Sequence, residues 1–522
     1  MAAALGLALM IAGVAAYLGD DVEIRETIIE AQGCRVPASI YEPHGAKRGD
    51  AVIFHGLAAN RALMSTLARA LARKSVRAYA LDLNGHGDNT DSFTFAAAER
   101  CAAAAVQKLA ADGEIRAEHT VIIGHSMGGD VALRLADAFA ASATVAISPG
   151  PLVRMPAPLE RLRIYAKPER LPANLLQQAA QFDLPLFAWS AEELTQQAGG
   201  VRVSEEDFRA GGARGITVVP WTTHTALVFD RVAIEQILQW IRRAWWEASV
   251  DAAAAEPRGQ VAAWQGRALL RIALPVGVVL LFPAALRWIA RVVPAGRDEA
   301  AALEFHGAWL TRWAAAAIFS AVILRVASPL AFLRLVTGAY LAAFLLITAL
   351  GFLALSRPHG QAVRELLRKA CDDWRASGLS GIAAGALMLA LALATRRELG
   401  DLWMNAERWW RFAALAPLLL PYCFAEEAIL GPVRASGARL RRRWRDYFVL
   451  RGVMWLAMMA GVLLLRSQEI LVLVMGLVFI VFSIAQRLGA DAVSRRFASA
   501  PSGAIFSAIL AAWFLAAVFP VL

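Results

Sequence analysis

The second half of the chain contains repeated apolar segments, and these limit the possible folds more than any other feature. Eight segments lie between residues 268 and 522, and each is long enough to cross a lipid bilayer as a helix. Backbone polar groups inside a bilayer must be satisfied within the protein, so we expect an all-α transmembrane helical bundle. The segments lie near residues 269–290, 307–327, 332–355, 379–395, 412–430, 447–465, 469–486 and 504–522.

The composition of the whole chain agrees with a membrane protein. Hydrophobic residues make up 58% of the 522 residues, which is more than one water-soluble core requires. The formal net charge is +10, but most of the excess arginine lies between the apolar segments. We interpret it as loop charge that faces a membrane surface, so we expect membrane lipids and no nucleic acid among the partners.

The chain is expected to have four parts. Residues 1–19 form an uncharged apolar segment, which we interpret as an uncleaved transmembrane anchor, with a cleaved signal peptide as the alternative. Residues 20–250 alternate short β-branched runs with alanine-rich helical patterns, which predicts an α/β domain with a mostly parallel sheet and helices on both faces. Residues 251–267 form a linker, and residues 268–522 form the membrane domain.

One short stretch of the α/β domain carries the strongest chemical signal. Thr120–Ile123 predicts a strand, Asp130–Asp137 predicts a helix, and the sequence Gly-His-Ser-Met-Gly lies between them. Gly124 and Gly128 suit a strained turn, because a Cβ at either position would crowd it. A strand, a sharp turn and a helix are what a nucleophile elbow requires, so Ser126 is the candidate nucleophile.

Three further motifs follow predicted strands of the same domain. His55-Gly56 follows a strand at 51–54, Asp82-x-x-Gly-His-Gly87 follows a strand at 77–82, and His224 follows a late strand at 215–219. Together with the Gly-x-Ser-x-Gly turn, these motifs resemble the α/β-hydrolase superfamily over about residues 22–246. The resemblance implies a serine hydrolase whose triad follows the chain order serine, acid, histidine. A further strand is predicted at 143–148, and helices are predicted at 61–74, 95–110 and 231–245.

The position of His224 makes it the candidate base. Only two other histidines follow Ser126, and both fall among the membrane segments. A base is needed because a serine hydroxyl is a poor nucleophile until its proton is removed. The oxyanion hole would consist of the backbone N–H groups of Met127 and Leu57. His86 and His125 are interpreted as packing or hydrogen-bonding residues of their turns.

The acid of the triad has two candidates. Asp183 would follow a strand that begins near Asn174, which leaves room for a helical crossover after Ser148. Glu169 would follow a competing strand at 162–166, but only about a dozen residues then separate that strand from Ser148. We prefer Asp183, although Gln177–Ala180 would also suit a helix.

The cysteines give no sign of a metal or cofactor site. Cys34, Cys101, Cys371 and Cys423 have neither metal-ligand spacing nor the pattern of a disulfide framework. We therefore expect no metal and no cofactor, and the sequence does not decide whether Cys34 and Cys101 form a disulfide.

Basic residues are distributed unequally between the two sets of alternating loops, which predicts a topology. The richer set lies at 291–305, 356–378, 431–445 and 487–503, and the positive-inside rule places it in the cytoplasm. The α/β domain then lies on the outer, extracytoplasmic side of the inner membrane. The richer set contains Arg291, Arg297, Arg357, Arg364, Arg368, Lys369, Arg375, Arg434, Arg439, Arg441, Arg442, Arg443, Arg445, Arg487, Arg495 and Arg496, and the poorer set contains Arg325, Arg396, Arg397, Arg408, Arg411 and Arg466.

Two adjacent acids lie inside one apolar segment. Glu426 and Glu427 would be costly against lipid, so they should face a protein interior, a water cavity or the interface. The pair resembles the Glu-Glu-x-x-x-Arg signature of intramembrane CAAX-type proteases. Gly431 stands where that signature has arginine, and no partnering histidine pair follows, so we expect a structural, proton-linked or substrate-contacting role instead.

The sequence supports two hypotheses of function. The first is a membrane-anchored serine hydrolase that cleaves an ester, thioester or amide, with a small-molecule, lipid or acylated envelope substrate. The second is a multispan transporter or scaffold with a non-catalytic, hydrolase-like outer domain. The completeness of the serine, histidine and oxyanion motifs favours the first.

Overall fold

The computed structural model describes residues 2–153, 168, 170–245, 258–292, 309–398, 402–430, 438–466, 469 and 471–522, without the side chains of 258–269, 292 and 438–440. The chain forms two compact units. The sheet unit comprises Ile11–Leu274, Thr395–Asp401 and Pro520–Leu522, and the helical unit comprises Met1–Met10, Pro275–Ala394 and Leu402–Phe519.

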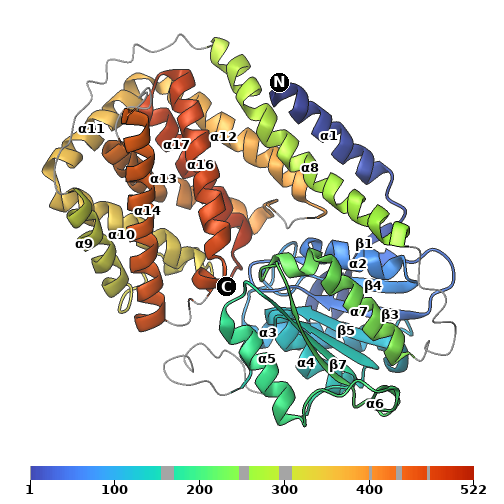
Figure 1. The fold of residues 1–522 in the computed structure, drawn as a ribbon. Coiled ribbons are helices and arrows are strands. Elements are labelled where there is room, and N and C mark those ends of the chain that lie inside the picture. Colours follow the sequence, from blue (N-terminus) through green and yellow to red (C-terminus); the bar gives the residue numbers. More distant parts are fainter. Residues whose placement is uncertain are drawn as a thin grey trace. The chain divides into compact units, whose positions relative to one another are not determined.

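An eight-stranded sheet forms the centre of the sheet unit (Figure 1). The six strands β3 to β8 pair in parallel with their neighbours among themselves. In contrast, β1 pairs antiparallel with β2, and β2 pairs antiparallel with β4. The predicted mostly parallel sheet is therefore confirmed. In spatial order the strands are β1 (Glu23–Ala31), β2 (Cys34–Glu42), β4 (Val76–Leu81), β3 (Gly49–Phe54), β5 (Thr120–His125), β6 (Ala143–Ile147), β7 (Leu175–Ala180) and β8 (Arg214–Val219).

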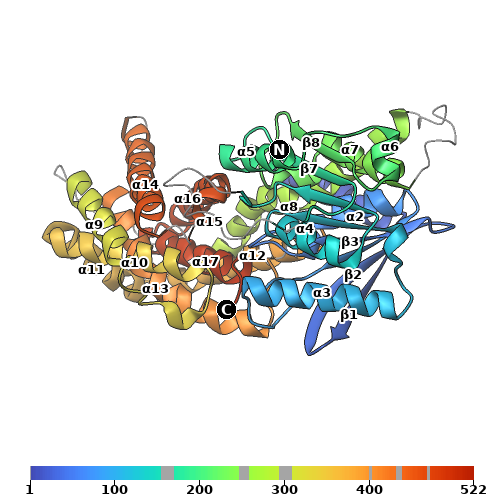
Figure 2. The ribbon, with the colours of Figure 1, turned by 90° about the horizontal axis from the view of Figure 1, so that it is seen from below.

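Helices cover both faces of this sheet, because each connection between parallel strands must cross over one face. One face carries α2 (Ser65–Ala72) and α7 (Arg231–Ala244), which share a core with residues of the central strands. Figure 2 shows α3 on the opposite side of the strands from α7. The other face carries α3 (Phe95–Ala111), α4 (Met127–Phe139) and α5 (Pro185–Gln197), and the short α6 (Glu205–Arg209) precedes β8.

The first two strands were not predicted from the sequence. They form a hairpin whose two-residue turn contains Gln32 and Gly33, both with positive φ, as a tight hairpin turn requires. A disulfide joins Cys34 of β2 to Cys101 of α3, with 5.5 Å between the Cα atoms. The sequence had left this bridge undecided, and it fastens α3 to the edge of the sheet.

The helical unit contains long apolar helices, as the sequence predicted. Seven described helices are long and apolar enough to cross a membrane. In the predicted segment 307–327 the described helix, α9 (Trp309–Ile323), has 15 residues and is shorter than these seven, and residues 307 and 308 lie outside the described residues. The long helices are α8 (Arg258–Ile289), α10 (Gly338–Leu355), α12 (Trp374–Thr395), α13 (Ala406–Leu430), α14 (Ala438–Leu465), α16 (Gly476–Phe497) and α17 (Ala500–Val518).

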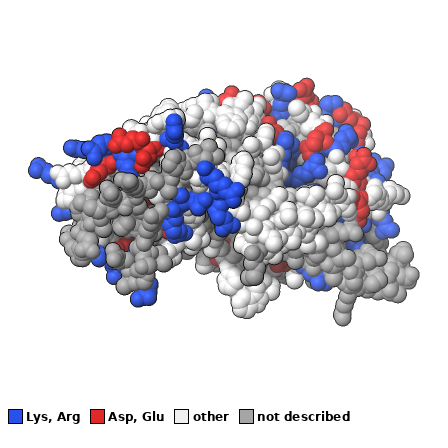
Figure 3. All heavy atoms as spheres, turned by 90° about the horizontal axis from the view of Figure 1, so that it is seen from above, with Lys and Arg blue, Asp and Glu red and all other residues white. Residues whose placement is uncertain are grey.

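The surface of these apolar helices agrees with a lipid environment. Exposed leucine, isoleucine, valine and tryptophan side chains are frequent on them, for example Trp288, Leu456 and Val481. In the space-filling view, broad areas carry no charged side chain (Figure 3). The N-terminal helix α1 (Ala2–Leu18) has 17 residues and is also apolar.

Three predicted cytoplasmic loops are shorter than expected. Arg443 lies inside α14 and Arg487 lies inside α16, although both were assigned to loops, and much of the predicted loop 356–378 is the helix α11 (Arg357–Asp372). A hydropathy pattern predicts that an apolar segment ends where arginines begin. Buried carboxylates of the helical unit, however, neutralise these two arginines. Their charge therefore does not mark the point where the chain leaves the membrane.

The partners of Arg443 and Arg487 include the two adjacent glutamates. Arg443 Nη2 lies 3.0 Å from both Glu427 Oε2 and Asp491 Oδ1, and Arg451 Nη2 lies 2.8 Å from Glu426 Oε2. All six side chains of this network are at least seven-eighths buried. The helical ion cluster consists of Glu426 and Glu427 of α13, Arg443 and Arg451 of α14, and Arg487 and Asp491 of α16.

Candidate active site

Ser126 lies at a sharp turn between β5 and α4. Its backbone has φ +52° and ψ −121°, a left-handed conformation that is strained for a residue with a Cβ. A Cβ on Gly124 would overlap the backbone of Gly128, and a Cβ on Gly128 would overlap the carbonyl of Phe54. Close backbone contact therefore leaves no room for a side chain at either glycine.

The structure places His224 and Asp183 in direct contact. His224 Nδ1 lies 2.8 Å from Asp183 Oδ2 and 3.1 Å from Asp183 Oδ1, and both side chains are buried. A carboxylate can only accept, so Nδ1 carries the proton and Nε2 has a free lone pair. Asp183 follows β7, which confirms that Gln177–Ala180 is a strand. The alternative acid, Glu169, lies outside the described residues.

His125 joins the loop of His224 to the elbow. Its Nε2 donates to the His224 carbonyl oxygen over 3.0 Å, and the two rings lie 4.9 Å apart. Burial, and secondarily the neighbouring His224, lowers the pKa of His125 to about 3. The ring is therefore neutral at physiological pH and acts as a fixed hydrogen-bond donor. This bond explains how residues 99 positions apart along the chain remain adjacent, and sequence analysis had assigned His125 only to its own turn.

The predicted oxyanion donors belong to two segments next to Ser126. Met127 is the first residue of α4, where a backbone N–H has no carbonyl partner within the helix. Leu57 follows Gly56, and a Cβ on Gly56 would lie 3.0 Å from Ser126 Cβ, so this loop passes directly beside the serine. Ala58 N–H donates to His86 Nε2 over 3.3 Å, which holds the loop at its next residue.

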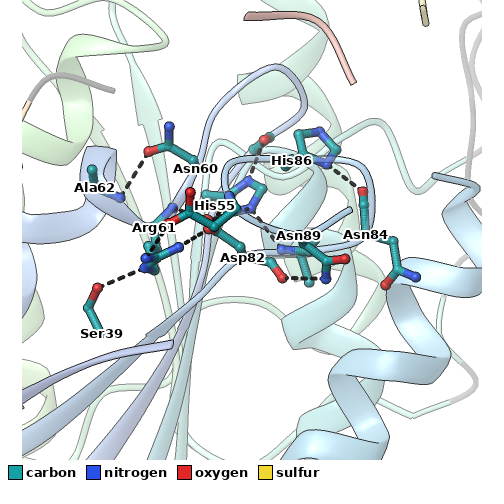
Figure 4. A network of polar contacts seen from close by, with 12 residues as sticks. Ser39, His55, Asn60, Arg61, Ala62, Asp82, Asn84, His86 and Asn89 are labelled. Atoms are coloured by element: carbon teal, nitrogen blue, oxygen red, sulfur yellow. Dashed lines mark hydrogen bonds and ion pairs between the residues drawn. The ribbon is translucent and has the colours of Figure 1, made fainter. Parts of the chain in front are cut away.

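A buried polar network supports that loop (Figure 4). His55 Nδ1 donates to Gly56 O over 2.8 Å, while His55 Nε2 accepts from Leu83 N–H over 3.0 Å. Asp82 accepts from the Arg61 backbone N–H over 2.8 Å and also forms an ion pair with the Arg61 guanidinium. Burial lowers the pKa of His55, so it too remains neutral. The sequence motifs named His55 and Asp82, but nothing local to them indicated Arg61 as the partner.

Among the residues that the structure describes, no group of three or more histidine, cysteine, aspartate or glutamate side chains could hold a metal ion. Glu426 and Glu427, singled out from the sequence, belong to the helical ion cluster.

Comparison with known proteins agrees with this geometry. Residues 45–193 match the family model described as serine aminopeptidase, S33, a match that contains Ser126 and Asp183. Together with the sheet order, it identifies an α/β-hydrolase domain, so the expected resemblance and fold class are confirmed. The match supports a hydrolase of the α/β class.

Solved structures of similar proteins are distant in sequence. An esterase from Pyrobaculum calidifontis is 17% identical, with coverage of 46% of this chain and 90% of that chain and a TM-score of 0.35. A dienelactone hydrolase from Anabaena variabilis is 16% identical, with coverage of 43% and 97% and a TM-score of 0.31. An esterase/lipase from an uncultured bacterium is 17% identical, with coverage of 46% and 91% and a TM-score of 0.32. No curated protein matches the sequence.

Proposed function

We propose that the protein is a membrane-anchored serine hydrolase that cleaves an ester, thioester or amide through an acyl-enzyme on Ser126. The observation that carries this proposal is the contact between His224 Nδ1 and Asp183, on a loop that His125 ties to the strained turn at Ser126. A nucleophile, a base and an orienting acid are the three parts that acyl transfer by serine requires.

The proposed reaction has two balanced halves. Ser126 Oγ attacks the substrate carbonyl while His224 Nε2 takes its proton, and Asp183 stabilises the resulting imidazolium. His224 then gives that proton to the leaving group, and the acyl group stays on Ser126. In the second half a water molecule loses a proton to His224 and attacks the acyl carbonyl. The bond between the acyl group and Ser126 Oγ then breaks, His224 returns the proton to Oγ, and the acid is released. Backbone donors at Met127 and Leu57 would stabilise the oxyanion by about 3 kcal/mol each.

We also propose that this domain lies outside the cytoplasm. A disulfide between Cys34 and Cys101 persists in an oxidising compartment and is rare in the cytosol. The basic residues then divide as the positive-inside rule requires.

The burial or exposure of individual basic side chains supports this division of charge. Arg408 and Arg411, on the poorer side, are buried and donate to backbone carbonyls, so they are structural rather than loop charges. Arg443 and Arg487 of the richer side are also buried, in the helical ion cluster, so they too are not counted as loop charges. Arg297 and Arg434 lie outside the described residues. Most of the remaining basic side chains of the richer side are exposed: Arg291, Arg357, Arg364, Arg368, Arg375, Arg441, Arg442, Arg445, Arg495 and Arg496.

The first helix supports an uncleaved anchor. A Cβ on Gly6 of α1 would lie 3.0 Å from the Gly277 carbonyl oxygen of α8, and a Cβ on Gly277 would lie 2.6 Å from that of Gly6. Small residues that let two helix backbones approach closely are typical of packing between membrane helices. A helix that packs in this way has a role after membrane insertion.

A fluorophosphonate probe tests the serine chemistry directly. We expect the wild-type protein in native membranes to be labelled, and Ser126→Ala to be unlabelled at equal expression. Labelling of Ser126→Ala at the wild-type level, or an unlabelled wild type, would refute the proposal and favour a transporter or scaffold with a non-catalytic outer domain. For sidedness, a reporter that is active only outside the cytoplasm, fused after residue 245, should be active; an inactive reporter would overturn the topology.

A further inference from the structure

Two exposed aromatic side chains lie beside the acid and the base. Phe182 directly precedes Asp183, and Trp221 lies three residues before His224. The two rings form an edge-to-face pair with centroids 5.9 Å apart. The side chain of Trp221 is 83% exposed and that of Phe182 is 54% exposed, so the pair faces outward rather than into the core.

Hydrogen bonds join the backbones of the two loops that carry this pair. Gln181 N–H donates to Val219 O over 2.9 Å, and Phe182 N–H donates to Thr222 O over 3.0 Å. Trp221 N–H donates to Gln181 Oε1 over 2.9 Å. The backbone positions that carry the two rings are therefore tied to the loops of Asp183 and His224.

The backbone of Trp221 is strained. Its φ is +57°, a left-handed conformation that glycine or asparagine adopts at much lower cost than tryptophan. The side chain gains little burial in return, because most of it faces solvent. An exposed apolar residue in a costly conformation, next to a buried acid and base, is the combination expected of a binding surface.

The chemistry of the surrounding residues indicates what binds there. Segments 181–189 and 218–224 contain no lysine, arginine or glutamate, and their only aspartate, Asp183, is buried against His224. Val218 and Trp189 of the same segments are also partly exposed. A surface without charge offers nothing to a charged headgroup, but it suits an alkyl chain, whose burial against aromatic rings is favourable.

We propose that Phe182 and Trp221 bind the alkyl chain of a long-chain acyl substrate at the entrance to the site. This inference rests on the proposed serine hydrolase activity and specifies its substrate class. The pair discriminates by chain length, because each additional methylene that contacts the rings adds binding energy that a short acyl group lacks.

The test uses the full-length protein and two fluorophosphonates, one with a dodecyl and one with an ethyl chain, so that both report on the same serine. We expect wild type to react at least tenfold faster with the dodecyl probe. Trp221→Asn keeps a residue that tolerates positive φ but removes the ring, and we expect it to lose most of this preference while its rate with the ethyl probe changes less than threefold. Ile28→Thr, which removes an exposed apolar side chain from β1, is the matched control and should keep the preference.

Each outcome has a distinct meaning. Equal loss with both probes in Trp221→Asn would show a structural role, and an unchanged preference would show that the pair binds no chain; either result overturns this inference alone. Failure of both probes to label wild-type Ser126 would instead refute the serine hydrolase proposal.

Discussion

Replacement of Asp183 by asparagine is the sharpest test of how the site works. The side chains are nearly isosteric, so the 2.8 Å contact with His224 Nδ1 can persist in the variant. The amide, however, can present its NH₂ group, and His224 would then carry its proton on Nε2, where it cannot accept one from Ser126. The buried negative charge that stabilises the imidazolium is also lost.

The magnitude follows from these two losses. A histidine in the wrong tautomer, with no carboxylate behind it, lowers turnover in comparable triads by roughly 10⁴-fold, which corresponds to about 5 kcal/mol of transition-state stabilisation. In the proposed mechanism Asp183 contacts His224 and not the substrate, so KM should change little and kcat should carry the effect. The fold should survive, because asparagine can still accept Leu184 N–H, which lies 2.9 Å from Asp183 Oδ1.

The assay compares wild type, Asp183→Asn and Glu169→Gln by steady-state hydrolysis and by the rate of fluorophosphonate labelling at fixed pH. We expect Asp183→Asn to lose about four orders of magnitude in kcat, and Glu169→Gln to remain near wild type. If Asp183→Asn kept more than a tenth of the activity with an unchanged melting temperature, the assignment of the acid would be wrong. The reverse order of the two variants would transfer the role to Glu169.

Further predictions concern the elbow, a buried acid and the disulfide. Gly128→Ala should abolish labelling of Ser126, because its Cβ would overlap the Phe54 carbonyl, whereas Ala132→Gly on the same helix should label normally. Burial raises the pKa of Asp130 to about 8, above its value in the unfolded chain, so its contribution to stability is complete below pH 4 and is lost as pH rises through 8. Melting temperatures at pH 5 and 9 should therefore differ less for Asp130→Asn than for wild type. Loss of the disulfide, which closes a loop of 67 residues, should lower the free energy of unfolding by roughly 4 kcal/mol in a denaturant titration of Cys34→Ser.

Local constraints explain which features of the site could be predicted. The turn at Ser126 depends on glycines within two positions of it, and each strand before a motif is a short apolar run, so both are visible in a single stretch of sequence. The prediction of Asp183 as the acid depended on the number of residues after Ser148 that a helical crossover to the next strand needs. His125 and Arg61 were missed as supports, because their partners lie 99 and 21 residues away and no local pattern indicates them.

The strand β1 and the ends of α14 and α16 could not be predicted from the sequence, and these failures share one physical cause. In β1 only one residue is buried, because the strand lies at the sheet edge, so its charged sequence lacks the apolar run of a central strand. In α14 and α16, arginines interrupt the apolar pattern although the helices continue, since partners on other helices neutralise them. In each case the environment that permits the residue is supplied by chain segments distant in sequence.

The helical ion cluster shows what the glutamate pair needs in place of a nearby arginine. The protease-like signature would supply an arginine four residues after the pair on the same helix, and glycine stands there instead. Arginines of α14 and α16 supply the positive charge instead, and three carboxylates face three guanidinium groups, so the cluster is neutral as a whole. A buried pair of charges is tolerable only when it is complete, because loss of one partner leaves an uncompensated charge that costs roughly 3–5 kcal/mol. The balance of charge therefore favours a structural role for Glu426 and Glu427 in joining three helices.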